Sequence, residues 1–284
     1  MIEITECPRD AMQGIHHFIP TEIKATYLNL LLKVGFDRLD FGSFVSPKAI
    51  PQLIDTVDVL HRLDLSQTST KLLAIIANVR GAIEACTHKE ISFLGFPFSV
   101  SETFQLRNTN AGITDSLERV KEIISLCDKH NKQPLVYLSM AFGNPYNDPW
   151  SPEIVTEYTE QLVQMGIKNL MLADTTGVST PENIKQLYDT LHASFPTIDL
   201  GMHLHSTPPT VVKKIEAAFN SGCKRFDTAL GGYGGCPMAS DKLTGNIATE
   251  ALLSFLKDKG NFAAINEEAL FQAQSYSNKK VFRP

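Results

Sequence analysis

The sequence predicts an α/β fold, a (β/α)8 TIM barrel with a C-terminal helical extension, on three observations. Short apolar runs alternate with segments of helical periodicity along the 284 residues. Strands that alternate with helices pair in parallel through right-handed crossovers. Eight such units in roughly 250 residues match the size of this barrel. No strand is followed by GxGxxG, so the alternative, a doubly wound open sheet, is less well supported.

The expected strands are eight short apolar runs. In chain order they cover residues 2–5, 38–44, 71–78, 90–96, 134–142, 169–175, 200–206 and 225–232. Helical periodicity fills the connections, for example at 21–35, 115–130 and 151–166. Two helices are expected to begin after Ser151 and Thr180, because each of these cap residues precedes a proline suited to the first helical position.

The chain has no linker, low-complexity segment or shift in composition that would mark a second globular domain. We therefore expect residues 1–262 to form a catalytic barrel. Residues 263–284 are expected to add a C-terminal helix and tail that pack on it.

The composition is that of an ordinary globular protein, with 43% hydrophobic and 20% charged residues. A net charge of −5 argues against a nucleic-acid partner. No apolar run is long enough to span a membrane, and the N-terminus shows no signal-peptide pattern. Five cysteines without a CxxC pair favour reduced thiols and a cytoplasmic location. Four of them are expected to be small buried hydrophobes, whereas Cys236 lies between glycines and a proline.

The segment GMHLHSTPP, residues 201–209, places two histidines two positions apart in an apolar run. In a strand, His203 and His205 would point to one face, and Met202 and Leu204 to the other. A single histidine there would usually be a core or rim residue. Two on one face of one strand favour a metal site. With oxygen ligands the pair would suit Mg²⁺ or Mn²⁺, and with a thiolate from Cys236 it would suit zinc.

Other polar residues also follow the expected strands, at the rim where such barrels hold their active sites. Asp174 is expected to be either a helix cap or a hydrogen-bonding partner at the rim. Asn246 precedes a helical segment and is a natural cap. Arg9 and Asp10 come directly after the first strand, where a surface ion pair between them is the simple alternative to a catalytic role.

Motifs along nearly the whole chain resemble hydroxymethylglutaryl-CoA lyases, a family of metal-dependent barrel enzymes related to Claisen synthases. They are CPRDAMQG (7–14), SFVSPK (43–48), SETF (101–104), NTNA (108–111), ADTTGVSTP (173–181), MHLH (202–205) and GGCPMA…GNIATE (234–250). The resemblance implies cleavage of 3-hydroxy-3-methylglutaryl-CoA, or a close 3-hydroxyacyl-CoA, to acetoacetate and acetyl-CoA. It also implies an acyl-CoA thioester as partner and a homodimer.

Residue by residue, the resemblance implies a cation bound by Asp10, His203, His205 and Asn246. Arg9 would stabilise the enolate, with His203 or Asp10 as the base. Cys236 would be the catalytic cysteine of a glycine-rich loop, and Asp40 takes the position of a family glutamate. Gln13 and Thr175 would line the pocket. Lys48 and Arg107 are candidates for contacts to the CoA phosphates, although solvated side chains are the simpler expectation.

The chain departs from the family pattern at several positions, of which two bear most on the expected site. Ser206 replaces an aspartate after HxH, which would remove a partner for the metal-binding histidines. Asp40 is one methylene shorter than the usual glutamate, and misplacing a carboxylate by about 1 Å can cost on the order of 10²-fold in rate. These departures leave open an impaired barrel with a binding role. An acetyl-CoA-dependent Claisen synthase of the same superfamily is a second alternative, although GGCP stands where the synthases carry a GER-type motif.

Overall fold

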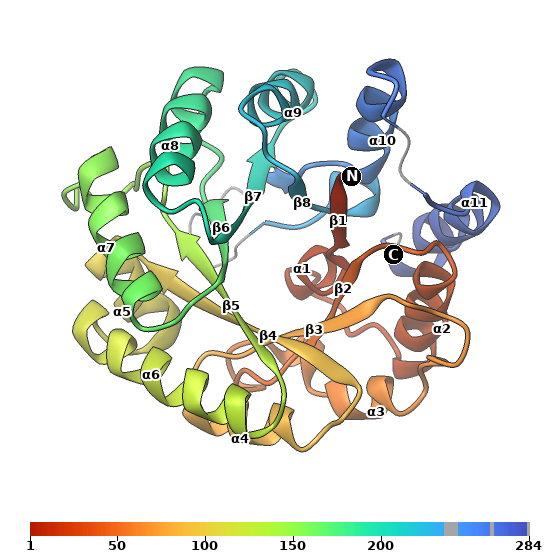
Figure 1. The fold of residues 1–284 in the computed structure, drawn as a ribbon. Coiled ribbons are helices and arrows are strands. Elements are labelled where there is room, and N and C mark those ends of the chain that lie inside the picture. Colours follow the sequence, from red (N-terminus) through yellow and green to blue (C-terminus); the bar gives the residue numbers. More distant parts are fainter. Residues whose placement is uncertain (236–243, 262–263, 283–284) are drawn as a thin grey trace.

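The computed structural model describes residues 1–235, 244–261 and 264–282, and its centre is a closed barrel of eight parallel strands (Figure 1). The strands are β1 Glu3–Glu6, β2 Arg38–Ser43, β3 Lys71–Ile75, β4 Ile91–Ser99, β5 Gln133–Ser139, β6 Asn169–Asp174, β7 Asp199–Ser206 and β8 Arg225–Thr228. Each pairs with the next in chain order, and β8 pairs with β1 to close the ring. The predicted TIM barrel is confirmed.

Helices surround the barrel on its outside (Figure 1). They are α2 Thr21–Leu32, α3 Thr56–Leu60, α4 Val79–Cys86, α6 Ile113–Lys129, α7 Pro152–Gln164, α8 Pro181–Ser194, α9 Val211–Asn220 and α10 Thr249–Asp258. Two short helices, α1 Pro8–Gln13 and α5 Glu102–Thr109, follow β1 and β4, and a 3-10 turn spans Pro51–Leu53. Ser151 caps α7 and Thr180 caps α8 through a reciprocal capping box, as expected from the sequence.

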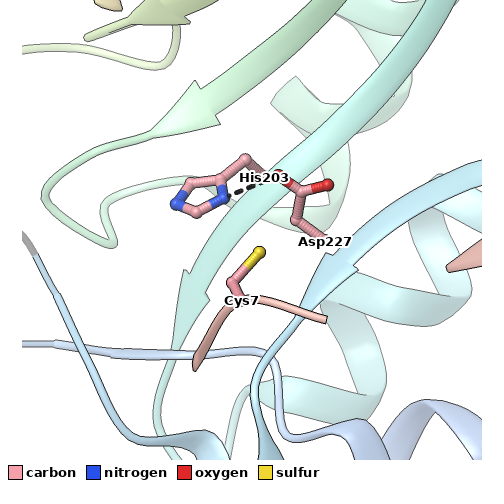
Figure 2. Close-up of side chains that lie close together, drawn as sticks. All are labelled: Cys7, His203 and Asp227. Atoms are coloured by element: carbon pink, nitrogen blue, oxygen red, sulfur yellow. Dashed lines mark hydrogen bonds and ion pairs between the residues drawn. The ribbon is translucent and has the colours of Figure 1, made fainter. Parts of the chain in front are cut away.

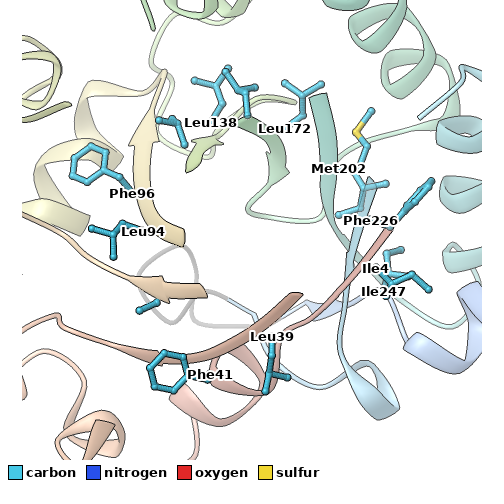
Figure 3. Packing of buried hydrophobic residues seen from close by; sticks show 14 of the residues in the cluster. Ile4, Leu39, Phe41, Leu94, Phe96, Leu138, Leu172, Met202, Phe226 and Ile247 are labelled. Carbon is cyan, nitrogen blue, oxygen red and sulfur yellow. The ribbon is translucent and has the colours of Figure 1, made fainter. Parts of the chain in front are cut away.

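The strands use their two faces differently, because side chains alternate along a strand. Outward side chains pack against the helices in the larger apolar cluster; Figure 3 shows Leu39, Phe96, Met202 and Phe226 among them. A smaller cluster fills the barrel interior with Leu73, Ile75, Phe93, Leu135, Tyr137 and Met171. The interior is thus a packed core, and polar residues lie at its two ends.

The chain after β8 adds a short strand that the sequence pattern did not predict. Gly245–Asn246 forms β9, which pairs antiparallel with the end of β7 and places Asn246 opposite His205. Asn246 is therefore a strand residue, and the natural-cap interpretation is wrong. Ala248, not Asn246, occupies the cap position of α10.

The C-terminal segment begins with α11 Glu267–Tyr276 and continues as a π-helical turn, Ser277–Val281. The helix lies against α2, and the backbone N–H of Asn266 donates to the Val34 carbonyl at 2.8 Å. Phe282 then meets the buried Tyr27 ring edge-on. In the described residues no helix is both long enough and apolar enough to cross a membrane.

Candidate active site

His203 and His205 both face the barrel interior from the end of β7, as the alternation predicts. Their ring centroids lie 5.2 Å apart, and both residues are buried. His203 Nδ1 pairs with Asp227 Oδ2 at 3.1 Å, and His205 Nδ1 pairs with the Thr175 carbonyl at 3.0 Å. Each Nε2 is thereby left for another partner. The Nε2 of His205 is buried without a hydrogen-bond partner among the described residues.

Asp10 reaches the same place from α1, the short helix after β1. Pro8 starts this helix, so Asp10 lies in its first turn and is buried. Its Oδ1 accepts from Gln13 Nε2 at 2.7 Å, and its Oδ2 from Asn246 Nδ2 at 2.6 Å. One potential ligand atom each from Asp10, His203 and His205 lies within 4.8 Å of the others. The structure therefore brings together three residues able to hold a metal ion.

Arg9 is buried beside Asp10 and is held chiefly by Asp40 of β2. Its Nε donates to both Asp40 oxygens at 3.1 and 3.0 Å, and its Nη2 donates to Oδ2 at 2.6 Å. Nη1 donates to Gln13 Oε1 at 2.8 Å and to Asp10 Oδ1 at 3.2 Å. The alternative of an exposed Arg9–Asp10 pair is wrong. Asp40 makes the contact despite its shorter side chain.

Burial and neighbouring charges separate the acid–base properties of these groups. Burial raises the pKa of Asp10, but the charges of Arg9 and His203 outweigh it and hold that pKa to about 2. Burial raises the pKa of Asp40 to about 6 against the opposing effect of Arg9. Burial lowers the pKa of His205 to about 4, helped by the charge of His203. His203 differs: Asp227 overcomes the effect of burial and raises its pKa.

A cavity of about 870 Å³, measured with its open mouth, lies over these groups. Arg9, Asp10, Gln13, Thr175, His203 and His205 line it, together with apolar side chains. Thr175 also accepts the Met140 backbone N–H at 2.9 Å with its hydroxyl oxygen. Lys48 and Arg107 are exposed, and their sequence neighbours Ala49 and Asn108 line the cavity.

Asn246 lies at the site, but its amide is turned differently from the expectation. Its nitrogen faces Asp10, and it also donates to the Tyr233 carbonyl at 2.9 Å. A cation ligand would need the amide oxygen on that side, so the amide would have to turn over. Cys236, the expected catalytic cysteine, lies outside the described residues.

Sequence reasoning missed two buried residues that hold the histidines in place. Asp227 faces the interior two positions after Arg225 on β8 and bonds to His203. A carboxylate within an expected strand was the available signal, since a buried charge needs a partner. Lys214 of α9 donates to Asp174 Oδ2 at 2.7 Å and to the His205 carbonyl at 2.7 Å. Asp174 is thus a hydrogen-bonding partner at the rim, not a helix cap.

The replacement of an aspartate by Ser206 does not leave the imidazoles without support. Asp227 and the Thr175 carbonyl supply the Nδ1 partners from neighbouring strands. The Ser206 hydroxyl lies 3.4 Å from the carbonyl oxygen of Asn246 instead.

Comparisons with known proteins agree with the motifs. A family model described as HMGL-like matches residues 2–276. The hydroxymethylglutaryl-CoA lyase of Bacillus subtilis (strain 168) is 33% identical over 98% of this chain and 92% of its own. The solved structure of the Bacillus subtilis HMG-CoA lyase matches with a TM-score of 0.92 at 32% identity, covering 100% of this chain and 94% of that one.

A further solved structure is an HMG-CoA lyase from Acinetobacter baumannii in complex with coenzyme A and 3-methylmalate. It matches with a TM-score of 0.89 at 32% identity, over 96% of this chain and 89% of that one. The resemblance inferred from the motifs is confirmed. This chain belongs to the HMGL-like family of divalent-metal-dependent lyases.

Proposed function

We propose that this protein is a divalent-cation-dependent carbon–carbon lyase that cleaves 3-hydroxy-3-methylglutaryl-CoA, or a close 3-hydroxyacyl-CoA, to acetoacetate and acetyl-CoA. The main support is the convergence of Asp10, His203 and His205 in a cavity beside the buried guanidinium of Arg9. Full-length similarity to HMG-CoA lyases adds to it. The complex of the Acinetobacter enzyme with coenzyme A supports an acyl-CoA thioester as substrate.

The donor set fits a hard divalent cation such as Mg²⁺ or Mn²⁺. Asp10, His203, His205 and, with its amide turned, Asn246 would hold it. The buried Nε2 of His205, which has no partner among the described residues, is a lone pair that such an ion would satisfy. When bound, the cation would lower the pKa of the substrate's tertiary alcohol, which is otherwise too weak an acid at neutral pH.

The remaining chemistry falls to side chains of this chain. His203 or Asp10 takes the proton from the alcohol. The electron pair left by the broken O–H bond forms the second carbon–oxygen bond of the acetoacetate ketone. The carbon–carbon bond breaks at the same time, and its electron pair forms the enolate of acetyl-CoA. Arg9, fixed by Asp40, stabilises the charge on the thioester oxygen. Cys236 then protonates the enolate carbon, and Gln13 and Thr175 orient the substrate.

Assaying a panel of short 3-hydroxyacyl-CoA thioesters with and without chelator tests the proposal. We expect 3-hydroxy-3-methylglutaryl-CoA to give acetoacetate and acetyl-CoA in equal amounts, with loss of activity in EDTA and recovery with Mg²⁺ or Mn²⁺. If the metal-loaded enzyme cleaved none of the thioesters, the proposal would be contradicted. Release of free thiol from acetyl-CoA and a 2-oxoacid would instead indicate a Claisen synthase.

The cellular setting is also proposed. A cytoplasmic enzyme that works as a homodimer agrees with the reduced-thiol interpretation and with the family resemblance.

A further inference from the structure

A thiol lies beside the histidine–aspartate pair of the candidate site. Cys7 follows β1, and Figure 2 shows its sulfur pointing toward the bond between His203 and Asp227. One potential ligand atom from each of these three residues lies within 4.8 Å of the others. Cys7 is 1% exposed, so the sulfur faces this pair and not solvent. The expected role of a small buried hydrophobe fits the burial of Cys7 but does not require its sulfur to face this pair, and none of the catalytic roles proposed above uses it.

The spacing is close to that of ligands around one tetrahedral zinc ion. Zn–N and Zn–O bonds of about 2.0–2.2 Å place two such atoms about 3.3 Å apart at the tetrahedral angle. His203 Nδ1 and Asp227 Oδ2 are 3.1 Å apart. With a Zn–S bond of about 2.3 Å, the sulfur should lie about 3.6 Å from each. The sulfur lies within 4.8 Å of one ligand atom of each partner, so a rotation about the Cys7 side-chain bond and a small shift of the ring would bring three ligands to bonding distance, with the fourth position left to water.

Charge balance favours a divalent ion here, and the thiolate ligand favours a soft one over a hard one. The thiolate of Cys7 and the carboxylate of Asp227 together balance a charge of +2, so the buried site becomes neutral. A thiolate selects Zn²⁺, Co²⁺ or Cd²⁺ over Mg²⁺. On binding, the thiol proton passes to buffer, and the imidazole proton moves from Nδ1 to Nε2.

We propose that Cys7, His203 and Asp227 form a second cation site, specific for thiophilic divalent ions, which competes with the first site for His203. Competition follows because a neutral imidazole has only one lone pair. An ion at Nδ1 leaves the proton on Nε2, and His203 then cannot hold an ion with Asp10 and His205. Zinc at the second site therefore inhibits the enzyme, a consequence that rests on the proposed lyase function.

Titration with Co²⁺ tests the site without any assay of activity. We expect an ultraviolet thiolate-to-cobalt charge-transfer band that Cys7→Ala abolishes. Cys223→Ala is the matched control, because Cys223 is also 1% exposed and precedes β8. Cys236→Ala tests the other thiol expected near the site. A band that survives Cys7→Ala, or one that disappears only with Cys236→Ala, overturns the proposal.

Inhibition of the Mn²⁺-loaded enzyme by Zn²⁺ tests the competition. Cys7→Ala should keep the activity measured without zinc and raise the inhibitory Zn²⁺ concentration by about tenfold or more; thermal unfolding checks that the variant is folded. Equal inhibition of both proteins overturns the competition. A Cys7-dependent cobalt band in a protein without lyase activity would refute the proposed function and leave the second site standing. Lyase activity without a Cys7-dependent band would refute the second cation site and leave the proposed function standing.

Discussion

Arg9 is the residue whose geometry most restricts the chemistry of the site. Its guanidinium donates to Asp40, Asp10 and Gln13 at once, so the planar fork is fixed before any substrate binds. A lysine has a single charged nitrogen and cannot reproduce these directed bonds. The fixed guanidinium would stabilise the negative charge that develops on the thioester oxygen in the transition state, not the uncharged ground-state thioester.

Arg9→Lys should therefore lower kcat by about 10²-fold or more with a much smaller change in KM. Steady-state kinetics with 3-hydroxy-3-methylglutaryl-CoA and saturating Mn²⁺ would measure both constants. Arg62→Lys, at an exposed ion pair with Glu22, is the control and should leave both constants unchanged. A kcat within threefold of that of the unmodified enzyme would remove Arg9 from the mechanism.

Glu6 is a buried carboxyl group whose ionisation opposes folding. Burial raises its pKa from 4.5 to about 8, and Glu250 adds to the effect. The acid accepts the Leu230 N–H at 2.8 Å and the Thr249 hydroxyl at 2.6 Å. Because the folded-state pKa is the higher one, its contribution to stability is full below about pH 4.5 and is lost as the pH rises to 8.

Glu6→Gln should remove this pH dependence, because glutamine resembles the protonated acid in shape. We expect similar free energies of unfolding for the two proteins near pH 5. The variant should become more stable by a few kcal/mol at pH 9. Urea unfolding at pH 5, 7 and 9 measures the difference. Glu122→Gln, on the exposed side of α6, is the control and should change the free energy of unfolding equally at the three pH values. If the free energy of unfolding of Glu6→Gln followed that of the unmodified protein at all three, the prediction would be refuted.

At the scale of elements, α9 holds the end of β7 against the loop after β6. The buried ammonium of Lys214 donates to Asp174, to the Gly177 carbonyl and to the His205 carbonyl. Asp174 also accepts the Ser179 hydroxyl at 2.5 Å. One helix residue thus fixes the backbone of His205 and the segment that includes its partner, Thr175.

Lys214→Met should destabilise the protein by about 3–5 kcal/mol, because it leaves the buried Asp174 carboxylate without its cation. Chemical denaturation measures this, and isothermal titration with Mn²⁺ should show weaker binding as His205 loses support. Lys213→Met, the exposed neighbour, should cost less than about 0.5 kcal/mol. A similar loss in the free energy of unfolding for the two variants would contradict the contacts assigned to Lys214.

Strand and helix periodicity was enough to predict the barrel, its eight strands and the shared face of His203 and His205. It could not predict β9, because two residues have no period. Nor could it show that Asp40 reaches Arg9 or that Asp227 supports His203, since each contact joins residues from different elements, β2 with α1 and β8 with β7. For Asn246, local sequence favoured a helix cap, but pairing with β7 decided its conformation.

At the scale of the whole molecule, the two ends of the barrel serve different purposes. At the N-terminal end, Arg225 pairs with Asp199, and Arg38 pairs with Glu3 at 2.7 Å, next to the ring of Phe93. These contacts close the barrel below the apolar layer. The candidate site lies at the opposite end, as in other barrels of this type. The ion pairs at the N-terminal end therefore close the barrel without including any of the proposed cation ligands.

The C-terminal segment connects to the candidate site through a pair of aromatic rings. Phe282 stacks on Tyr233 with centroids 4.1 Å apart and planes at 12°. The Tyr233 carbonyl accepts the side-chain N–H of Asn246, which also donates to Asp10. The C-terminal segment therefore supports the Tyr233 carbonyl, which keeps the amide nitrogen of Asn246 turned toward Asp10.

A double-mutant cycle between Tyr233→Leu and Phe282→Leu should give a coupling free energy of about 1 kcal/mol, because the stacked pair is worth more than the area it buries. Urea unfolding of the four proteins measures it. Phe282→Leu should also strengthen Mn²⁺ binding, because the Tyr233 carbonyl that it loosens holds the Asn246 amide in the orientation opposite to that of a cation ligand. Phe271→Leu is the control on α11, where a ring 65% exposed to solvent should contribute little to either quantity. A coupling near zero together with unchanged Mn²⁺ affinity would show that the C-terminal segment covers the barrel without acting on its site.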